Sequence, residues 1–217
     1  MLTRSLLAST EPLELFGEDK EQRYFTAEER QTSLKNVLSI KPDDCSVWVF
    51  AYGSLIWNPI IDYAECCKAH LDGWTRAFCM KLNSGRATSD RPGRMLALVP
   101  GQGSSGLVYR LHDENLEESL SLLWTREMST DSYRARWERV TLSDGSSVIA
   151  LVFVMSCHHS TYDKAYQTED IARKIALASG PLGSNADYLF MLQDSLKKLN
   201  IQDDYIDSMA IAVTKLL

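Results

Sequence analysis

The apolar positions of the chain fall in short blocks, and the spacing of these blocks predicts the secondary structure. Residues 47–50 form one such block, rich in β-branched and aromatic residues, with acidic residues before it and a glycine after it. A block of this kind is typical of a buried strand. Further strands are predicted at residues 64–72, 74–82, 95–99, 107–111, 134–142 and 147–156. Glycine-containing turns are predicted at residues 72–73, 101–106 and 143–145.

Apolar residues at three- to four-residue spacing predict helices around these strands. Thr26 and Glu29 have the spacing of a capping box and predict a helix to about residue 38. A second helix is predicted at about residues 114–126, with Asp113 as its cap. The later helices are predicted from residue 168, from residue 184 after a break at 179–183, and after residue 204. Residues 1–25 have little pattern and predict an irregular lead-in.

Short, mostly antiparallel strands with one inserted helix and a helical tail predict an α+β fold, with a small curled sheet or barrel and flanking helices. At 217 residues the chain has the length of one domain, or of one domain with an appendage. We therefore predict an N-terminal helical extension at residues 1–45, packed on a main domain at residues 46–217.

Composition narrows the possible partners and the compartment. The net charge of −6 argues against a broad nucleic-acid-binding surface. No apolar run is long enough for a membrane-spanning helix, and the N-terminus lacks the pattern of a signal peptide. Five cysteines are an odd number without metal-like spacing, which predicts free thiols, a cytoplasmic location and no metal site.

The first predicted strand ends in a turn with candidate chemistry, formed by Tyr52, Gly53, Ser54 and Leu55. Gly53 can take a positive φ and lets another group approach the backbone closely. Ser54 adds a hydroxyl that can donate and accept. Such a turn points successive N–H groups into one small space, which suits a carboxylate or a developing oxyanion. An ordinary strand-ending turn is the alternative, and these four residues alone favour it.

Glu127 is the carboxylate with the strongest indication of a perturbed pKa. It falls at the predicted C-terminal end of a helix, where the macrodipole disfavours a negative charge. Trp124 and Met128 indicate apolar surroundings that also raise the pKa, whereas Arg126 opposes this if it turns inward. A raised pKa suits a group that takes and returns a proton near neutrality. Without other information, a surface Glu paired with a neighbouring Arg is favoured.

Two other segments carry candidate chemistry. Cys157, His158 and His159 are adjacent, and neighbours in a strand point to opposite faces, so neither a nucleophile–base pair nor a metal site is predicted there. Residues 179–185 precede a predicted helix, whose free N-terminal amides can attract an anion. A break between two helices with a serine cap is the alternative, and the sequence favours it.

Six runs of residues occur in a fixed order along the chain. They are VFAYGSLIW at 49–57, GWTRAF at 73–78, PGR at 92–94, VYRL at 108–111, WTREM at 124–128 and SGPLGSNADYLF at 179–190. Together they resemble the ChaC-type glutathione-specific gamma-glutamylcyclotransferases, and the bacterial branch in particular. The resemblance covers about residues 46–200, and the N-terminal extension also resembles that of the bacterial members.

This resemblance implies a gamma-glutamylcyclotransferase-like fold, with a catalytic domain at 46–217, and a lyase reaction of glutathione catabolism. The α-amine of the γ-glutamyl group attacks its own γ-carbonyl, giving 5-oxoproline and cysteinylglycine without a cofactor, a metal or added water. The acid/base role is assigned to Glu127, and Tyr133 is expected to hydrogen-bond the substrate. Binding of the γ-glutamyl group is assigned to the strand and its turn, that is to Val49, Phe50, Ala51, Tyr52, Gly53, Ser54 and Leu55.

Two positions depart from the family's pattern. Ala51 stands where glycine is common, so the backbone there must accommodate a Cβ. Asp131 also stands where glycine is common, and it adds a negative charge near the site. Two alternatives to a glutathione-specific enzyme are ring closure on another γ-glutamyl amine or dipeptide, and a non-catalytic binding or regulatory protein on the same fold. Retention of both the turn and Glu127 argues against the second.

Overall fold

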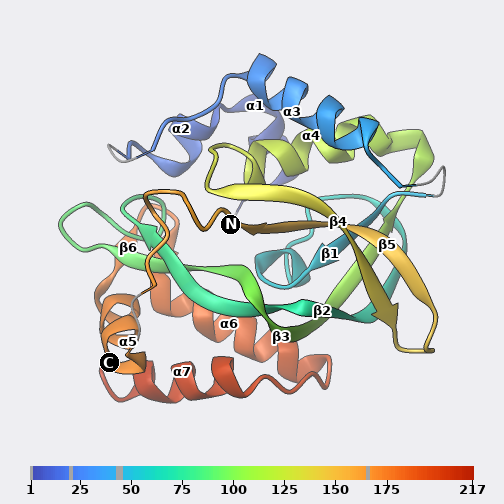
Figure 1. Cartoon of the computed structure of the whole chain (residues 1–217). Coiled ribbons are helices and arrows are strands. Elements are labelled where there is room, and N and C mark those ends of the chain that lie inside the picture. Colours follow the sequence, from blue (N-terminus) through green and yellow to red (C-terminus); the bar gives the residue numbers. More distant parts are fainter. Residues whose placement is uncertain (1, 20–21, 43–45, 165–166) are drawn as a thin grey trace.

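A closed five-stranded barrel forms the centre of the computed structural model, which describes residues 2–19, 22–42, 46–164 and 167–217 (Figure 1). The strands are β1 (Trp48–Ala51), β2 (Tyr63–Leu82), β3 (Gly93–Leu111), β4 (Tyr133–Leu142) and β5 (Ser147–Met155). They pair in the order β1-β3-β2-β4-β5, and β1 closes the barrel by pairing parallel with β5. The other barrel pairs are antiparallel. The predicted α+β fold with a small, mostly antiparallel barrel is therefore confirmed.

Helices flank the barrel on two opposite sides in Figure 1. On one side lie α1 (Arg4–Ser9), α2 (Pro12–Phe16), α3 (Ala27–Ser39) and α4 (Leu116–Glu127). On the other lie α5 (Thr168–Leu177), α6 (Asn185–Lys198) and α7 (Asp204–Thr214). The short elements are η1 (Ser54–Ile56), η2 (Asp113–Asn115), β6 (Ser179–Gly180) and β7 (Gly183–Ser184). Within the described residues, no helix is both long and apolar enough to cross a membrane.

Capping residues account for most of the predicted helix starts. Thr26 and Glu29 form the expected capping box at α3, and Asp203 caps α7. Ser184 begins α6 in a second capping box, so the favoured interpretation of this segment as a capped helix break is confirmed. The predicted cap of α4 is wrong, because Asp113 lies in η2 and α4 begins at Leu116 without a side-chain cap.

Two predicted turns are instead parts of long strands. The expected hairpin at residues 72–73 is absent, because β2 runs without interruption past Gly73, which takes a φ of +78° at a shift in register. A glycine with positive φ can bend a strand as a bulge as well as reverse it in a turn. The expected turn at residues 101–106 is likewise extended and pairs with β2, for example at Ala69 and Gly106.

The N-terminal segment is more ordered than the sequence predicts. Residues 1–25 are not an irregular lead-in, because they contain α1 and α2. These short helices bury Leu7 and Leu15 in the same apolar core as the barrel, and this packing stabilises helices too short to be stable alone. Asp43 and Asp44, which were expected to end the first helix, and Cys45, at the expected domain boundary, lie outside the described residues. The division between residues 1–45 and 46–217 stays a prediction.

Candidate active site

A cavity of about 580 Å³ lies where β1, α4, β4 and α6 meet. It is lined by the turn after β1, by the end of α4 and by the start of β4. Six of the nine predicted site residues line it, namely Tyr52, Gly53, Ser54, Leu55, Glu127 and Tyr133. The structure thus brings the predicted acid/base group and the predicted turn into one space, although they are far apart in the sequence.

The three remaining predicted residues do not reach the cavity. Val49, Phe50 and Ala51 have no exposed surface and belong to the apolar core on the two faces of β1. Ala51, which replaces the family's common glycine, lies in the regular part of β1, so its Cβ is accommodated without distortion of the strand. Gly106 makes room beside it, since a Cβ there would come within 2.2 Å of the Ala51 carbonyl oxygen. These three residues support the turn rather than line the space beside it.

Gly53 is required by crowding and not by its backbone conformation. Its φ is −129°, so the freedom of glycine to take a positive φ is not used here. A Cβ at this position would lie 2.8 Å from the hydroxyl oxygen of Tyr188 on α6, which is closer than real Cβ contacts. The close approach expected for this glycine is therefore present, and the approaching group is a tyrosine hydroxyl.

Glu127 is the last residue of α4, and its side chain is only 16% exposed. Burial raises its pKa, and the guanidinium of Arg126 opposes this shift. The Nε of Arg126 lies 3.1 Å from Glu127 Oε1. Within the described part of the chain no hydrogen bond is made to Oε2, and Glu127 lines the cavity. The ion pair expected as the alternative is present, but it lines the cavity and does not lie on the outer surface.

Arg126 joins the two halves of the site. It donates from Nη2 to Ser54 Oγ at 2.6 Å and from Nη1 to the Asn58 carbonyl at 2.7 Å. The same guanidinium therefore holds both Glu127 and the turn that follows β1. From the sequence, Arg126 was expected only to lower the pKa of Glu127 or to pair with it at the surface, and its place in the WTREM run is the signal that could have marked it as a site residue.

The buried Tyr52 and Tyr188 and the half-buried Tyr133 lie near Glu127. Burial raises the pKa of Tyr52 and Tyr133 well above the ordinary value, and it raises the pKa of Tyr188 to about 12. All three therefore stay protonated near neutrality and can donate hydrogen bonds. Tyr133 donates to the Leu96 carbonyl at 3.0 Å. Tyr188 was not predicted as a site residue, although it lies in the SGPLGSNADYLF run.

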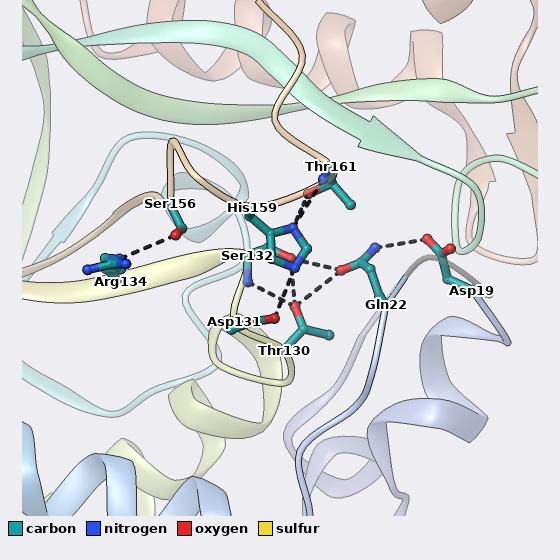
Figure 2. Close-up of polar contacts among 9 residues, drawn as sticks. All are labelled: Asp19, Gln22, Thr130, Asp131, Ser132, Arg134, Ser156, His159 and Thr161. Carbon is teal, nitrogen blue, oxygen red and sulfur yellow. Dashed lines mark hydrogen bonds and ion pairs between the residues drawn. The ribbon is translucent and has the colours of Figure 1, made fainter.

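The N-terminal segment forms part of the cavity wall, and Figure 2 shows how it is attached to the loop after Glu127. Gln22 Oε1 accepts from Thr130 Oγ1 at 3.2 Å and from Ser132 Oγ at 2.8 Å, and Gln22 Nε2 donates to Asp19 at 2.8 Å. Nothing in the spacing of residues 1–25 indicated these contacts. The segment therefore packs on the main body, as predicted, and also lines the candidate site.

Asp131 contacts the turn that follows β5. Its carboxylate lies 2.9 Å from His159 Nε2, and His159 Nδ1 bonds the Thr161 hydroxyl at 2.7 Å (Figure 2). Cys66, Cys67, Cys79 and Cys157 are free thiols, and none of them lines the cavity. Among the residues that the structure describes, no three His, Cys, Asp or Glu side chains are grouped as a metal site.

Comparisons with known proteins match this arrangement to one family. A family model described as ChaC-like protein matches residues 47–216. The chain is 46% identical, over its whole length and 94% of the relative, to a glutathione-specific gamma-glutamylcyclotransferase of Escherichia coli K12. It is 32% identical to gamma-glutamylcyclotransferase 2-1 of Arabidopsis thaliana, over 79% of this chain and 83% of that protein.

A solved structure extends the match to the fold. The crystal structure of a gamma-glutamyl cyclotransferase specific to glutathione from yeast aligns with a TM-score of 0.72 at 22% identity. The alignment covers 79% of this chain and 97% of the yeast chain. The predicted gamma-glutamylcyclotransferase-like fold is thereby confirmed.

Proposed function

This chain belongs to the ChaC-like family, and we propose that Glu127 moves the proton in the reaction that its cavity supports. The protein is a glutathione-specific gamma-glutamylcyclotransferase, a lyase that converts glutathione to 5-oxoproline and cysteinylglycine. One observation supports this role for Glu127: Arg126 pairs with Glu127 and donates a hydrogen bond to Ser54, and all three line the same cavity. A buried carboxylate with a raised pKa thus lies beside a turn that can hold an anionic group.

The reaction moves two protons in all from the attacking nitrogen to the leaving nitrogen, because the α-ammonium becomes a ring amide N–H and the cysteinyl amide N–H becomes an ammonium. The α-ammonium of the γ-glutamyl group must lose a proton before its nitrogen can attack the γ-carbonyl carbon. The cysteinyl nitrogen must gain a proton as its bond to that carbon breaks. A single carboxylate can perform both transfers, and the unpartnered Oε2 of Glu127 is the atom we assign to them. Intramolecular attack needs mainly orientation, which the rigid turn supplies.

Ser54 and the tyrosines supply donors for the charge that develops on the γ-carbonyl oxygen. Ser54 Oγ accepts from Arg126, and the Ser54 hydroxyl and amide lie close enough to the Tyr188 hydroxyl to hydrogen-bond it, so that Ser54 and Tyr188 form one pair of donors beside the cavity. We assign binding of the γ-glutamyl carboxylate and stabilisation of the oxyanion to the 52–55 turn and to the hydroxyl of Tyr188. Donors fixed in advance in a site of low polarity stabilise a transition state without reorganisation. Tyr133 is assigned to substrate contact beside them.

The compartment and the absence of a nucleic-acid partner are also proposals. We place the protein in the cytoplasm because Cys66, Cys67, Cys79 and Cys157 are free thiols, which a reducing compartment maintains. The absence of a nucleic-acid partner stays a prediction from the net charge of −6.

Substrate choice tests the glutathione specificity. Reduced glutathione is expected to be turned over far faster than γ-glutamyl-alanine or γ-glutamyl-lysine at equal concentration, because only glutathione carries the cysteinylglycine half for the cavity to recognise beyond the γ-glutamyl group. The measurement is the initial rate of 5-oxoproline formation from each compound. Equal rates would refute the glutathione specificity and leave the reaction type intact. A non-catalytic protein on this fold would form no 5-oxoproline from any of them.

The pH dependence tests the protonation state assigned to Glu127. Its carboxylate form is the base, and burial raises its pKa, so kcat/KM is expected to fall on the acid side at a higher pH than an exposed Glu would give. Arg126 lowers the same pKa, so Arg126→Gln is expected to move the acid limb to still higher pH. The two pH–rate profiles are the measurement. If Arg126→Gln does not move the acid limb, the group that titrates there is not Glu127.

A further inference from the structure

The cavity contains one cation that the proposed mechanism does not use. Glutathione carries an ammonium and two carboxylates at neutral pH, and its second carboxylate is at the glycine end. Among the residues that line the cavity, Arg86 and Arg126 are the cationic side chains. Arg126 is already paired with Glu127. Arg86 is therefore the group in this space that can neutralise the second carboxylate.

Arg86 is half-buried and has donors to spare. Its Nη1 donates to the Ser184 carbonyl at 2.9 Å, and its guanidinium carbon lies 5.9 Å from the ring centroid of Tyr188. Arg86 forms no ion pair with another described residue, although the Asp187 carboxylate, which also lines the cavity, lies near enough to favour its charged form. A guanidinium has five N–H donors in a planar fork that matches a carboxylate, and burial strengthens such a pair.

The loop that carries Arg86 is fixed in place by the β6–β7 hairpin. The Leu182 N–H donates to the Gly85 carbonyl at 2.9 Å. Gly180 lies so close that a Cβ there would come within 2.5 Å of the same oxygen. The 179–184 segment therefore holds the backbone of Arg86 before any ligand arrives, and binding to a preorganised group loses less entropy.

Tyr188 contacts both Arg86 and the turn at Gly53. Its ring lies beneath the guanidinium, and its hydroxyl lies at the position that a Gly53 Cβ would crowd. The cation and the turn thus border the same tyrosine side chain, the cation at its ring and the turn at its hydroxyl. In extended glutathione, two residues separate the γ-carbonyl from the glycine carboxylate, a span of at most about 7 Å. A γ-glutamyl group in the turn leaves the other end of the tripeptide within reach of Arg86.

We propose that Arg86 binds the glycine carboxylate of glutathione and so selects this tripeptide over shorter γ-glutamyl compounds. The inference rests on the proposed function, because it places the γ-glutamyl group at the turn after β1. It assigns the recognition of the two ends of the substrate to two different arginine-containing sites: the turn with Arg126, and the hairpin-supported loop with Arg86.

The test removes the charge of Arg86 by substitution and the charge of the glycine carboxylate by esterification. We would measure kcat/KM for glutathione and for its glycine ethyl ester with wild type, Arg86→Gln and Arg86→Lys. Arg86→Gln is expected to lose about 10- to 100-fold on glutathione, the range for a hydrogen bond to a charged group, and little on the ester. Arg86→Lys should recover part of the loss. Arg91→Gln, at an exposed position on the same loop outside the cavity, is the matched control and should change neither rate.

Two outcomes separate this inference from the proposed function. If wild type turns over glutathione but Arg86→Gln loses equally on both compounds, Arg86 contacts another part of the substrate and the proposal is overturned. If wild type makes no 5-oxoproline, the proposed function fails. Calorimetry then tests Arg86 without turnover. It measures the affinities for glutathione and for the ester in Glu127→Gln and in Glu127→Gln/Arg86→Gln. Equal affinities for the two compounds in Glu127→Gln would refute the role of Arg86.

Discussion

Replacement of Glu127 by Gln is expected to lower kcat by about a hundred- to ten-thousand-fold, the usual contribution of general acid–base catalysis. Gln keeps the size of the side chain and can still contact Arg126, but it cannot accept the ammonium proton. The affinity for a γ-glutamyl analogue should change much less, because the 52–55 turn holds that group. Glu127→Asp should also retain little activity, since it withdraws the carboxylate by about a methylene and errors near 1 Å can cost a hundred-fold.

The stability of the same variant provides an independent check. Burial raises the pKa of Glu127, so the folded protein binds this proton more tightly than the unfolded chain does. Its contribution to the free energy of unfolding therefore decreases as the pH rises from the ordinary Glu range through the raised pKa. Glu127→Gln should accordingly unfold at the same or a higher temperature than wild type at neutral pH, with a smaller difference in acid.

The matched control for both measurements is Glu117→Gln, an exposed carboxylate on the same helix. It should leave kcat and the unfolding temperature unchanged. A Glu127→Gln protein that is folded and still makes 5-oxoproline near the wild-type rate would mean that another group moves the proton.

Gly53→Ala is expected to reduce turnover by about a hundred-fold, the cost of a misplacement near 1 Å in a preorganised site. The added Cβ would lie 2.8 Å from the Tyr188 hydroxyl, so either the turn or the tyrosine must move. Both border the cavity, and Tyr188 is only 5% exposed and has little room to retreat. Affinity for a γ-glutamyl analogue, measured by calorimetry, should therefore weaken together with kcat.

The second variant, Gly53→Ala/Tyr188→Phe, isolates the steric cause. Removal of the hydroxyl leaves Leu96 Cδ2, at an ordinary 3.7 Å, as the nearest remaining neighbour of the Cβ. Because Tyr188→Phe also removes a hydroxyl assigned to the γ-glutamyl group, Tyr188→Phe alone is the reference, and Gly53→Ala should weaken binding of the analogue less in the Tyr188→Phe background than in wild type. Unchanged binding by Gly53→Ala would limit this turn to a structural role.

The sequence predicted the local elements better than their connections. Periodicity and caps located α3, α5, α6, α7 and the β4–β5 hairpin, because these features depend on neighbouring residues. Gly73 was interpreted as a hairpin turn, since a glycine with positive φ serves a turn or a bulge equally well. The pairing that decides between the two lies with residues about thirty positions later, on β3. Local pattern carries no information on that choice.

The same limit applies to the site. Glu127 and the turn at Gly53 could be singled out because a helix end, apolar neighbours and a Gly-Ser turn are local signals. Arg126, Tyr188 and Gln22 act through contacts with distant segments, to Ser54, to Gly53 and to the 130–132 loop. Val49, Phe50 and Ala51 were included because they adjoin the turn, and strand burial placed them in the core.

The fate of water in the reaction tests the central claim most directly. Wild-type protein with glutathione in ¹⁸O-labelled water is expected to yield equal amounts of 5-oxoproline and cysteinylglycine, with no label in either and no free glutamate. Ring closure consumes no water, whereas hydrolysis of the same bond gives glutamate with one labelled oxygen. Mass spectrometry of the products, with Glu127→Gln as the background control, distinguishes the two. Labelled glutamate, or 5-oxoproline formed as fast with Glu127→Gln as with wild type, would contradict cyclisation driven by Glu127.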